Sequence, residues 1–224
     1  MRISTLLTFV VVLIAGAGAS AMVSAADDAS CHFLPMADST VDLQHAQSVG
    51  VLYSENTVNT LEYLERYHSV ALNGAKHAGL DPRISQAFIS SSDPKLAINW
   101  LMASLQQHFT SVTVYDSLDA VVQAHPDVVV MLDTYNQLVT KSNSKVEARF
   151  IAKFYDANLQ YIGQAEGLQA KELPSVWVRG KAAPEIAAQI NQQTELQVDA
   201  LKQFDVSLKA LVTQGQAGQV ATNK

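Results

Sequence analysis

The histidines are the side chains of this sequence best suited to bind a metal or to move a proton, and their spacing argues against the simplest metal site. No two of the six lie three or four positions apart, the spacing that brings two imidazole rings together on one face of a helix. They are His32, His45, His68, His77, His108 and His125. A metal site would need ligands gathered from distant parts of the chain, so we expect no bound metal.

Two aspartates and one of these histidines are further candidates for acid–base chemistry. Asp127 and Asp133 bracket an apolar strand, and their even spacing puts both side chains on one face. At the ends of a strand, aspartates usually belong to solvated turns, and we favour that interpretation. His68 falls on the apolar side of an expected helix, where a histidine hydrogen-bonded at the border of the core is more common than a ligand.

The motifs of several common enzyme classes are missing from the sequence. There is no Gly-x-Ser-x-Gly nucleophile turn, no phosphate-binding loop and no dinucleotide fingerprint after a strand. The single cysteine, Cys31, excludes the Cys-x-x-Cys chemistry of thiol–disulfide exchange. We therefore expect a protein that is not an enzyme and carries no cofactor, although folding can also assemble a catalytic site from distant residues.

The first residues have the pattern of a secretory signal peptide. Arg2 precedes an apolar run at 6–14, and small residues follow as far as Ala25. The apolar run is too short to span a hydrocarbon core of roughly 30 Å, which argues against a membrane anchor. We expect cleavage after Ala25, with Ala21 and Ala26 as alternatives, and hence a periplasmic protein.

Cys31 raises the question of lipid attachment. A lipoprotein signal has an aliphatic residue three positions before its cysteine, and Asp28 stands there instead. A lone cysteine also has no partner within its own chain for a disulfide. We therefore favour a free or intermolecular thiol, and regard an outer-membrane lipoprotein as the alternative.

The charge of the chain limits its partners. The formal net charge is −6, and it becomes −7 once the signal peptide with Arg2 is removed. A chain this acidic does not attract nucleic acid or an anionic membrane through its bulk charge.

The clearest structural signal is a β-hairpin over 145–169. Apolar and polar residues alternate along its first half, a break follows at 156–158, and the pattern then resumes. Such a hairpin has one buried and one solvated face. The side chains expected to be buried are Phe150 and Phe154, and those expected to point outward are Arg149 and Lys153.

Shorter patterns predict the elements around this hairpin. They are strands at 48–54, 87–91, 112–115 and 127–132, helices at 61–75 and 118–124, a helix capped by Ser92 with Pro94 in its first turn, and a long helix from Pro184 to 212. The strand at 127–132 is the most apolar and should lie in the middle of the sheet.

This order of elements predicts an α/β to α+β fold. Its mixed sheet carries a C-terminal antiparallel hairpin, helices packed on it and a long C-terminal helix. The chain then divides into a signal peptide at 1–25, an extended arm at 26–47, a single domain at 48–212 and a flexible tail at 213–224.

In its order of elements, its size and its signal, the sequence resembles small periplasmic domains of bacterial envelope-assembly proteins. Examples are the curli-secretion lipoproteins, the N-terminal domain of the Tol-system translocation protein and the activators of peptidoglycan synthases. The resemblance covers about 48–212 as a pattern of elements. It implies a protein that binds another envelope protein. A small-ligand-binding periplasmic protein and an enzyme of another type are the alternatives.

Three residues are candidates for the surface that meets such a partner. Trp177 lies in the loop 173–181, where it serves either as an exposed anchor or as part of the core. Leu208 and Leu211 lie on the apolar stripe of the final helix, which is longer than one hairpin needs. The alternative is that this helix crosses the whole sheet and is covered by it.

Overall fold

The computed structural model describes residues 38–76, 81–140, 143–174 and 180–222. The chain divides into two units, 1–30 and 31–224, and all described residues belong to the second unit. The predicted signal peptide, Cys31 and Trp177 lie outside the described residues, so the predictions made for them stay predictions.

Five strands form one mixed sheet in the order β2-β1-β3-β4-β5. They are β1 (Ser48–Tyr53), β2 (Ser111–Val114), β3 (Val128–Gln137), β4 (Lys145–Asp156) and β5 (Tyr161–Glu172). β1 is parallel to β2 and β3, whereas β4 is antiparallel to both β3 and β5. The apolar strand β3 lies in the middle of the sheet, as its sequence predicts, because it is buried on both faces along its first half.

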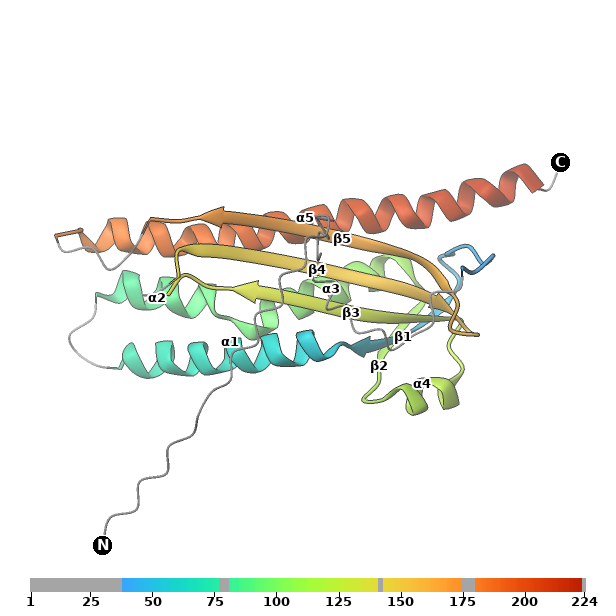
Figure 1. Cartoon of the computed structure of the whole chain (residues 1–224), viewed down its shortest axis with the longest axis horizontal. Helices are drawn as coiled ribbons and strands as arrows, with labels where there is room; N and C mark the ends of the chain where they lie inside the picture. Colours follow the sequence, from blue (N-terminus) through green and yellow to red (C-terminus); the bar gives the residue numbers. More distant parts are fainter. Residues whose placement is uncertain (1–37, 77–80, 141–142, 175–179, 223–224) are drawn as a thin grey trace, which may run out of the picture. The chain divides into compact units, whose positions relative to one another are not determined.

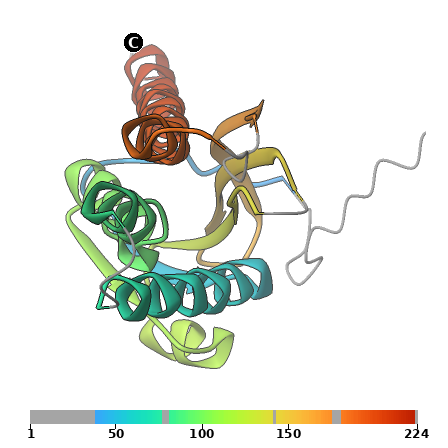
Figure 2. The same ribbon diagram turned by 90° about the vertical axis from the view of Figure 1, so that its left-hand side faces the viewer.

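Helices cover one face of this sheet more fully than the other. They are α1 (Glu55–Gly74), α2 (Pro82–Ser91), α3 (Pro94–His108), α4 (Leu118–Ala124) and α5 (Ala183–Thr222). α2, α3 and α5 lie on one side of the sheet, α4 lies near the start of β1 and α1 lies along one side of β3 (Figures 1 and 2). From the helices, the main core includes Leu101, Leu105, Ile190, Leu201 and Phe204, and Phe109 joins it directly after the end of α3. A smaller cluster joins Val121 of α4 to Val129 and Tyr155. The predicted fold class is confirmed.

The hairpin prediction is confirmed in its register. Phe150 and Phe154 are buried in the main core, while Arg149 and Lys153 alternate with them and are partly exposed. The turn is held by Asp156, whose Oδ1 accepts hydrogen bonds from the amides of Asn158 and Gln160 at 2.9 Å each. The hydroxyl of Ser39 donates to the other oxygen of this carboxylate and ties the chain entering the fold to the hairpin turn.

The strand predicted at 87–91 is wrong, because this segment belongs to helix α2. Asp81 caps the helix by accepting a hydrogen bond from the amide of Arg83 at 2.9 Å, and Pro82 occupies the first turn. The buried residues recur at helical spacing, which a short window of apolar residues does not reveal. The cap of α3 is Asp93; Ser92 instead ends α2, its hydroxyl donating to the carbonyl of Phe88.

The final helix follows strand β5 along its outer edge. The Ser207 hydroxyl accepts a hydrogen bond from the amide of Glu166, and the Gln203 side chain accepts one from Leu168. This contact requires Gly167, because a Cβ there would lie 1.9 Å from the carbonyl oxygen of Ala200. α5 also continues to Thr222, although the residues after 212 were expected to form a flexible tail.

Candidate functional site

Beside the second half of β3, helix α1 takes the place of a strand. β1 pairs with β3 only as far as Tyr53 and Leu132, and the chain then turns at Ser54 into α1. The helix was expected to begin later, at 61, but Ser54 caps it at Glu55 by accepting a hydrogen bond from Thr57. The edge of β3 beyond Leu132 therefore needs partners other than a strand for its backbone groups.

Two buried threonines of α1 supply these partners. The Thr57 hydroxyl donates to the carbonyl of Leu132 at 2.8 Å and accepts from the amide of Thr134 at 2.9 Å. The Thr60 hydroxyl donates to the carbonyl of Thr134 at 3.0 Å. These side chains reproduce the hydrogen bonds that the backbone of a neighbouring strand would make.

This row of hydrogen bonds has a gap at Asn136. The backbone groups of every second strand residue face the same side, and those of Thr134 and Leu138 face α1. The amide and carbonyl of Asn136, between them, therefore face α1 as well, yet the hydrogen bonds from the described part of α1 go to Leu132, Thr134 and Leu138, and none of them reaches Asn136. The Asn136 side chain is 6% exposed, and its Nδ2 has no hydrogen-bond partner in the described structure.

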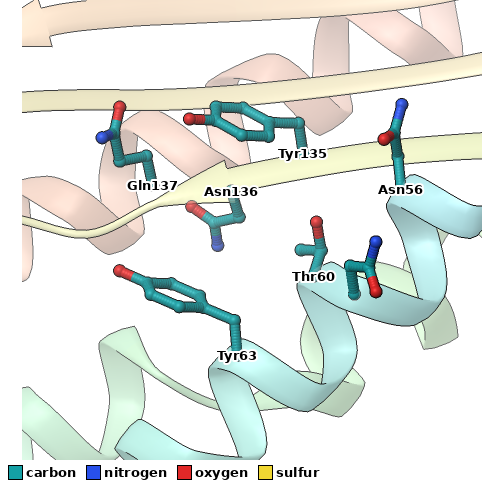
Figure 3. A pocket seen from close by; sticks show the side chains of 7 residues that line it. Asn56, Thr60, Tyr63, Tyr135, Asn136 and Gln137 are labelled. Atoms are coloured by element: carbon teal, nitrogen blue, oxygen red, sulfur yellow. The ribbon is translucent and has the colours of Figure 1, made fainter. Parts of the chain in front are cut away.

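The gap lies in a cleft of about 310 Å³ between α1 and β3. The lining residues are Asn56, Asn59, Thr60 and Tyr63 of α1 and Tyr135, Asn136 and Gln137 of β3. Figure 3 shows Asn136 pointing from the strand toward Thr60 and Tyr63, whereas Tyr135 and Gln137 project from the opposite side of the strand. The volume is at the lower end of the range of small-molecule pockets, roughly 300–1,000 Å³.

None of the residues that line the cleft carries a charged side chain. Its lining consists of amides, hydroxyls and phenols. Burial raises the pKa of the Tyr63 phenol to about 12, against a smaller lowering effect of the hydrogen bond from the amide of Leu138. Tyr63 is therefore protonated at neutral pH and can donate a hydrogen bond. The arrangement suits a neutral ligand rich in hydrogen-bonding groups, since none of the lining side chains carries a charge.

Neighbouring side chains hold both aromatic walls of the cleft in place. The ring centres of Tyr63 and Tyr67 lie 4.7 Å apart. The guanidinium carbon of Arg149 lies 5.8 Å from the centre of the Tyr135 ring, within the range of a cation–π interaction.

The two aspartates singled out from the sequence do not form a catalytic pair. Asp127 accepts hydrogen bonds from the amide and hydroxyl of Ser48, and these bonds lower the pKa of its carboxyl group. Asp133 accepts one from Ser54 at 3.0 Å and is buried within β3, so the expectation of a solvated turn residue is wrong for it. Along the extended strand, Asp127 and Asp133 lie roughly 20 Å apart, too far to act as a pair.

His68 has the border position expected of it. Its Nδ1 lies 3.1 Å from the carbonyl oxygen of Ile89 and 3.4 Å from the Ser92 hydroxyl, so it joins α1 to the end of α2. These two contacts give the His68 side chain a structural role.

The structure also brings together a serine, a histidine and an aspartate that the sequence analysis did not consider. Ser104 and His108 lie one turn apart on α3 and approach Asp205 of α5. The Ser104 hydroxyl donates to the carboxylate of Asp205, which also accepts from Trp100 Nε1 at 2.9 Å. In a catalytic triad the serine donates to the histidine instead. Asp205 thus serves to join the two helices.

The two candidate interface residues of α5 are less exposed than a partner-binding surface would require. Leu208 is fully buried in the main core, which corrects its assignment to a surface and favours the alternative that the sheet covers this part of α5. Leu211 is partly buried, and it lines a cavity of about 320 Å³ next to 39–43. The role of Trp177 stays a prediction.

A third cavity, of about 290 Å³, lies where β1 ends and α4 begins, and its lining includes Glu55 and Asp116. Among the residues that the structure describes, no group of three or more histidine, cysteine or acidic side chains is placed to hold a metal ion. None of the described helices has both the length and the apolar character needed to cross a bilayer.

No protein-family model matches the chain, and no curated protein matches it. Distant likenesses to solved structures are found. A dodecamer of PelC from Paraburkholderia phytofirmans is 14% identical, with a TM-score of 0.31, and the match covers 69% of this chain and 89% of that one. A Caulobacter crescentus CB15 protein described as a "putative lipoprotein" is 13% identical, with a TM-score of 0.28 and coverage of 76% and 91%. These likenesses are too distant to support a functional statement.

The class of protein defined by fold and site is an α+β domain with a cleft, lined by uncharged residues, between α1 and the central strand β3. The cleft itself was not predicted from the sequence. One signal for it exists: Thr57, Thr60 and Tyr63 recur every three residues on the side of α1 that an amphipathic helix turns inward.

Proposed function

We propose that this chain is an exported, non-catalytic binding protein of the bacterial cell envelope, and that the cleft between α1 and β3 holds another envelope protein. The observation that carries the proposal is the gap at Asn136, where a buried side-chain donor without a partner lies beside an unpaired strand edge. Buried polar groups are almost always satisfied, so this one favours a bound partner.

The chemistry of the cleft supports binding over catalysis. Its amides and hydroxyls do not change protonation near neutral pH, and Tyr63 stays protonated because its pKa is raised to about 12. General acid–base catalysis needs a group that titrates near the working pH.

A small neutral ligand is the second candidate. The volume of about 310 Å³ favours it, because a pocket of this size can enclose a small molecule. The two candidate ligands are distinguished by whether a protein or a small molecule is found bound to the purified protein.

The proposal is tested by capture from the envelope. The tagged protein is cross-linked in cells of its source bacterium, and the attached proteins are identified. Asn59→Trp fills the cleft from an exposed position on α1 and should abolish capture. Glu65→Trp, on an exposed residue of α1 that does not line the cleft, is the matched control. Equal capture by both variants would show that the cleft is not the binding site.

Export is tested separately by the intact mass of the protein recovered from the periplasm. We expect the mass of the chain without 1–25. A mass that retains these residues contradicts export with cleavage after Ala25, and an added diacylglycerol on Cys31 contradicts the unlipidated form.

If substitutions at Asp205 or His108 removed a measurable turnover, the chain would be an enzyme.

A further inference from the structure

The unsatisfied groups at Asn136 define what a ligand must offer. The backbone amide is a donor, the backbone carbonyl an acceptor, and Nδ2 of the side chain a second donor. All three groups belong to one residue at the edge of a strand. The backbone amide and carbonyl are the groups that a strand presents to the next strand of a sheet, and Nδ2 is an additional donor beside them.

α1 has already replaced a strand on both sides of this residue. Thr57 and Thr60 bond to Leu132 and Thr134 before it, and the Tyr63 hydroxyl accepts from the amide of Leu138 after it, at 3.4 Å. The helix therefore leaves room for about one residue of extended chain in the hydrogen-bonding row.

We propose that the cleft recognises the main chain of a peptide segment, one residue of which bonds to the edge of β3 at Asn136, between Thr60 and Tyr63. The segment's backbone N–H donates to the Asn136 carbonyl, and its backbone carbonyls accept from the Asn136 amide and Nδ2. The inference rests on the proposed function and specifies the part of the partner that is bound. Strand addition of this kind takes its affinity from main-chain hydrogen bonds and leaves sequence preference to the pockets beside them.

The neutrality of the lining favours a main chain over a charged side chain. Peptide groups are uncharged, and the lining amides, hydroxyls and phenols match them as donors and acceptors. Tyr63 and Tyr135 lie on opposite sides of the strand edge, where the alternating side chains of an added segment would pass. A sugar also carries paired donors and acceptors, and its binding is the alternative outcome of the test.

The test follows the amide resonances of Asn136 in ¹⁵N-labelled protein during titration with a short blocked peptide. The probe is acetyl-Thr-Ala-Thr-dimethylamide, and its matched control is the same peptide with every residue N-methylated. We expect saturable shifts of the Asn136 backbone and side-chain amides with the probe. Binding of the control should be weaker by roughly threefold to tenfold or more, since it lacks the N–H donors.

A variant examines the side-chain donor. Asn136→Ala should weaken probe binding by roughly threefold to tenfold. Gln164→Ala, at an exposed position of β5 outside the cleft, should leave binding unchanged. Because the native protein reports directly through its own Asn136 resonances, the test does not depend on how well the variant folds.

Three results would overturn the inference: no shift at Asn136 with the probe, equal binding of the N-methylated control, or binding of maltose at Asn136 in place of the probe. If Asn59→Trp still abolishes partner capture in that case, the proposed function stands and only the main-chain inference fails. If capture is unaffected by Asn59→Trp, the proposed function fails, and the inference that rests on it fails with it.

Discussion

Single polar side chains carry out tasks in this protein that backbone usually performs. Thr57 and Thr60 bond to the backbone of β3 at Leu132 and Thr134, and Asp156 closes the β4–β5 turn while accepting a hydrogen bond from Ser39. Each makes a hydrogen bond between segments far apart in the sequence or across a turn. Such roles depend on tertiary structure, so residue type alone does not reveal them.

Asp156 gives a prediction with a definite pH dependence. Burial by itself raises the pKa of its carboxyl group, but hydrogen bonds from Ser39, Gln160 and Asn158 outweigh this effect, and the pKa is lowered below its ordinary value of 3.8. The ionised form is thus favoured in the folded state. Its contribution to stability is present above pH 3.8 and is lost as the pH falls through the lowered pKa.

Asp156→Ala should therefore lower the free energy of unfolding by about 1–3 kcal/mol at pH 7, because it leaves amide and hydroxyl donors unpaired. Urea unfolding at several pH values measures this difference, which should shrink below pH 3.8. Asp156→Asn keeps an acceptor for the turn and should lose less. A difference that is the same at pH 7 and at pH 2 would contradict the assigned role.

Among the elements, the hairpin is the part of the fold that the sequence predicts best. Its period of two is long, and the core on one face fixes the register of Phe150 and Phe154. The short segment of α2 was misassigned, since a few apolar residues do not distinguish a buried strand from a helix. The strand predicted at 127–132 stops short of the polar end of β3, because nothing local shows that α1 would cover that end.

The register of the hairpin predicts unequal effects of two neighbouring substitutions. Phe150→Ala should cost about 3–5 kcal/mol of unfolding free energy, since a large buried side chain is removed from a packed core. Lys153→Ala, on the opposite face, should stay within about ±0.5 kcal/mol. Chemical denaturation of the two variants checks this, and similar losses would argue against the register.

Gly167 tests the contact between β5 and α5. A methyl group at this position would collide with the carbonyl of Ala200, which belongs to a helix backbone and cannot rotate away. Gly167→Ala should destabilise the protein by about 1–3 kcal/mol. Gly74→Ala is the matched control, because a Cβ there meets no atom within 4 Å. Thermal unfolding compares the two, and an unchanged midpoint for Gly167→Ala would exclude the close contact.

For the described domain taken together, the question is where a partner binds. The sequence pointed to the distal part of α5, because its apolar stripe is long, but the sheet already covers Leu208. The cleft was missed because it arises from the difference in length between β1 and β3, and pairing lengths are set by the whole sheet. An apolar stripe shows that a helix is covered, without showing what covers it.

Leu208→Glu should accordingly act on folding and not on recognition. A carboxylate in this fully buried position has no partner to compensate its lost hydration, so we expect loss of cooperative thermal unfolding. Val206→Glu is the matched control, since this neighbour on α5 is 70% exposed and should leave the unfolding midpoint nearly unchanged. A folded Leu208→Glu protein that fails to capture its partner would restore the interface interpretation.

The helices beside the long strands also affect how copies of the chain meet at high concentration. α5 covers the outer edge of β5 through Gln203 and Ser207. α1 covers most of the part of β3 that β1 leaves unpaired. The other outer strand, β2, is only four residues long. Exposed strand edges are where folded proteins begin to aggregate. Substituting Gln203 and Ser207 together by alanine removes the partners of the Leu168 and Glu166 amides, so a stored solution of the variant should turn turbid sooner than that of the native protein.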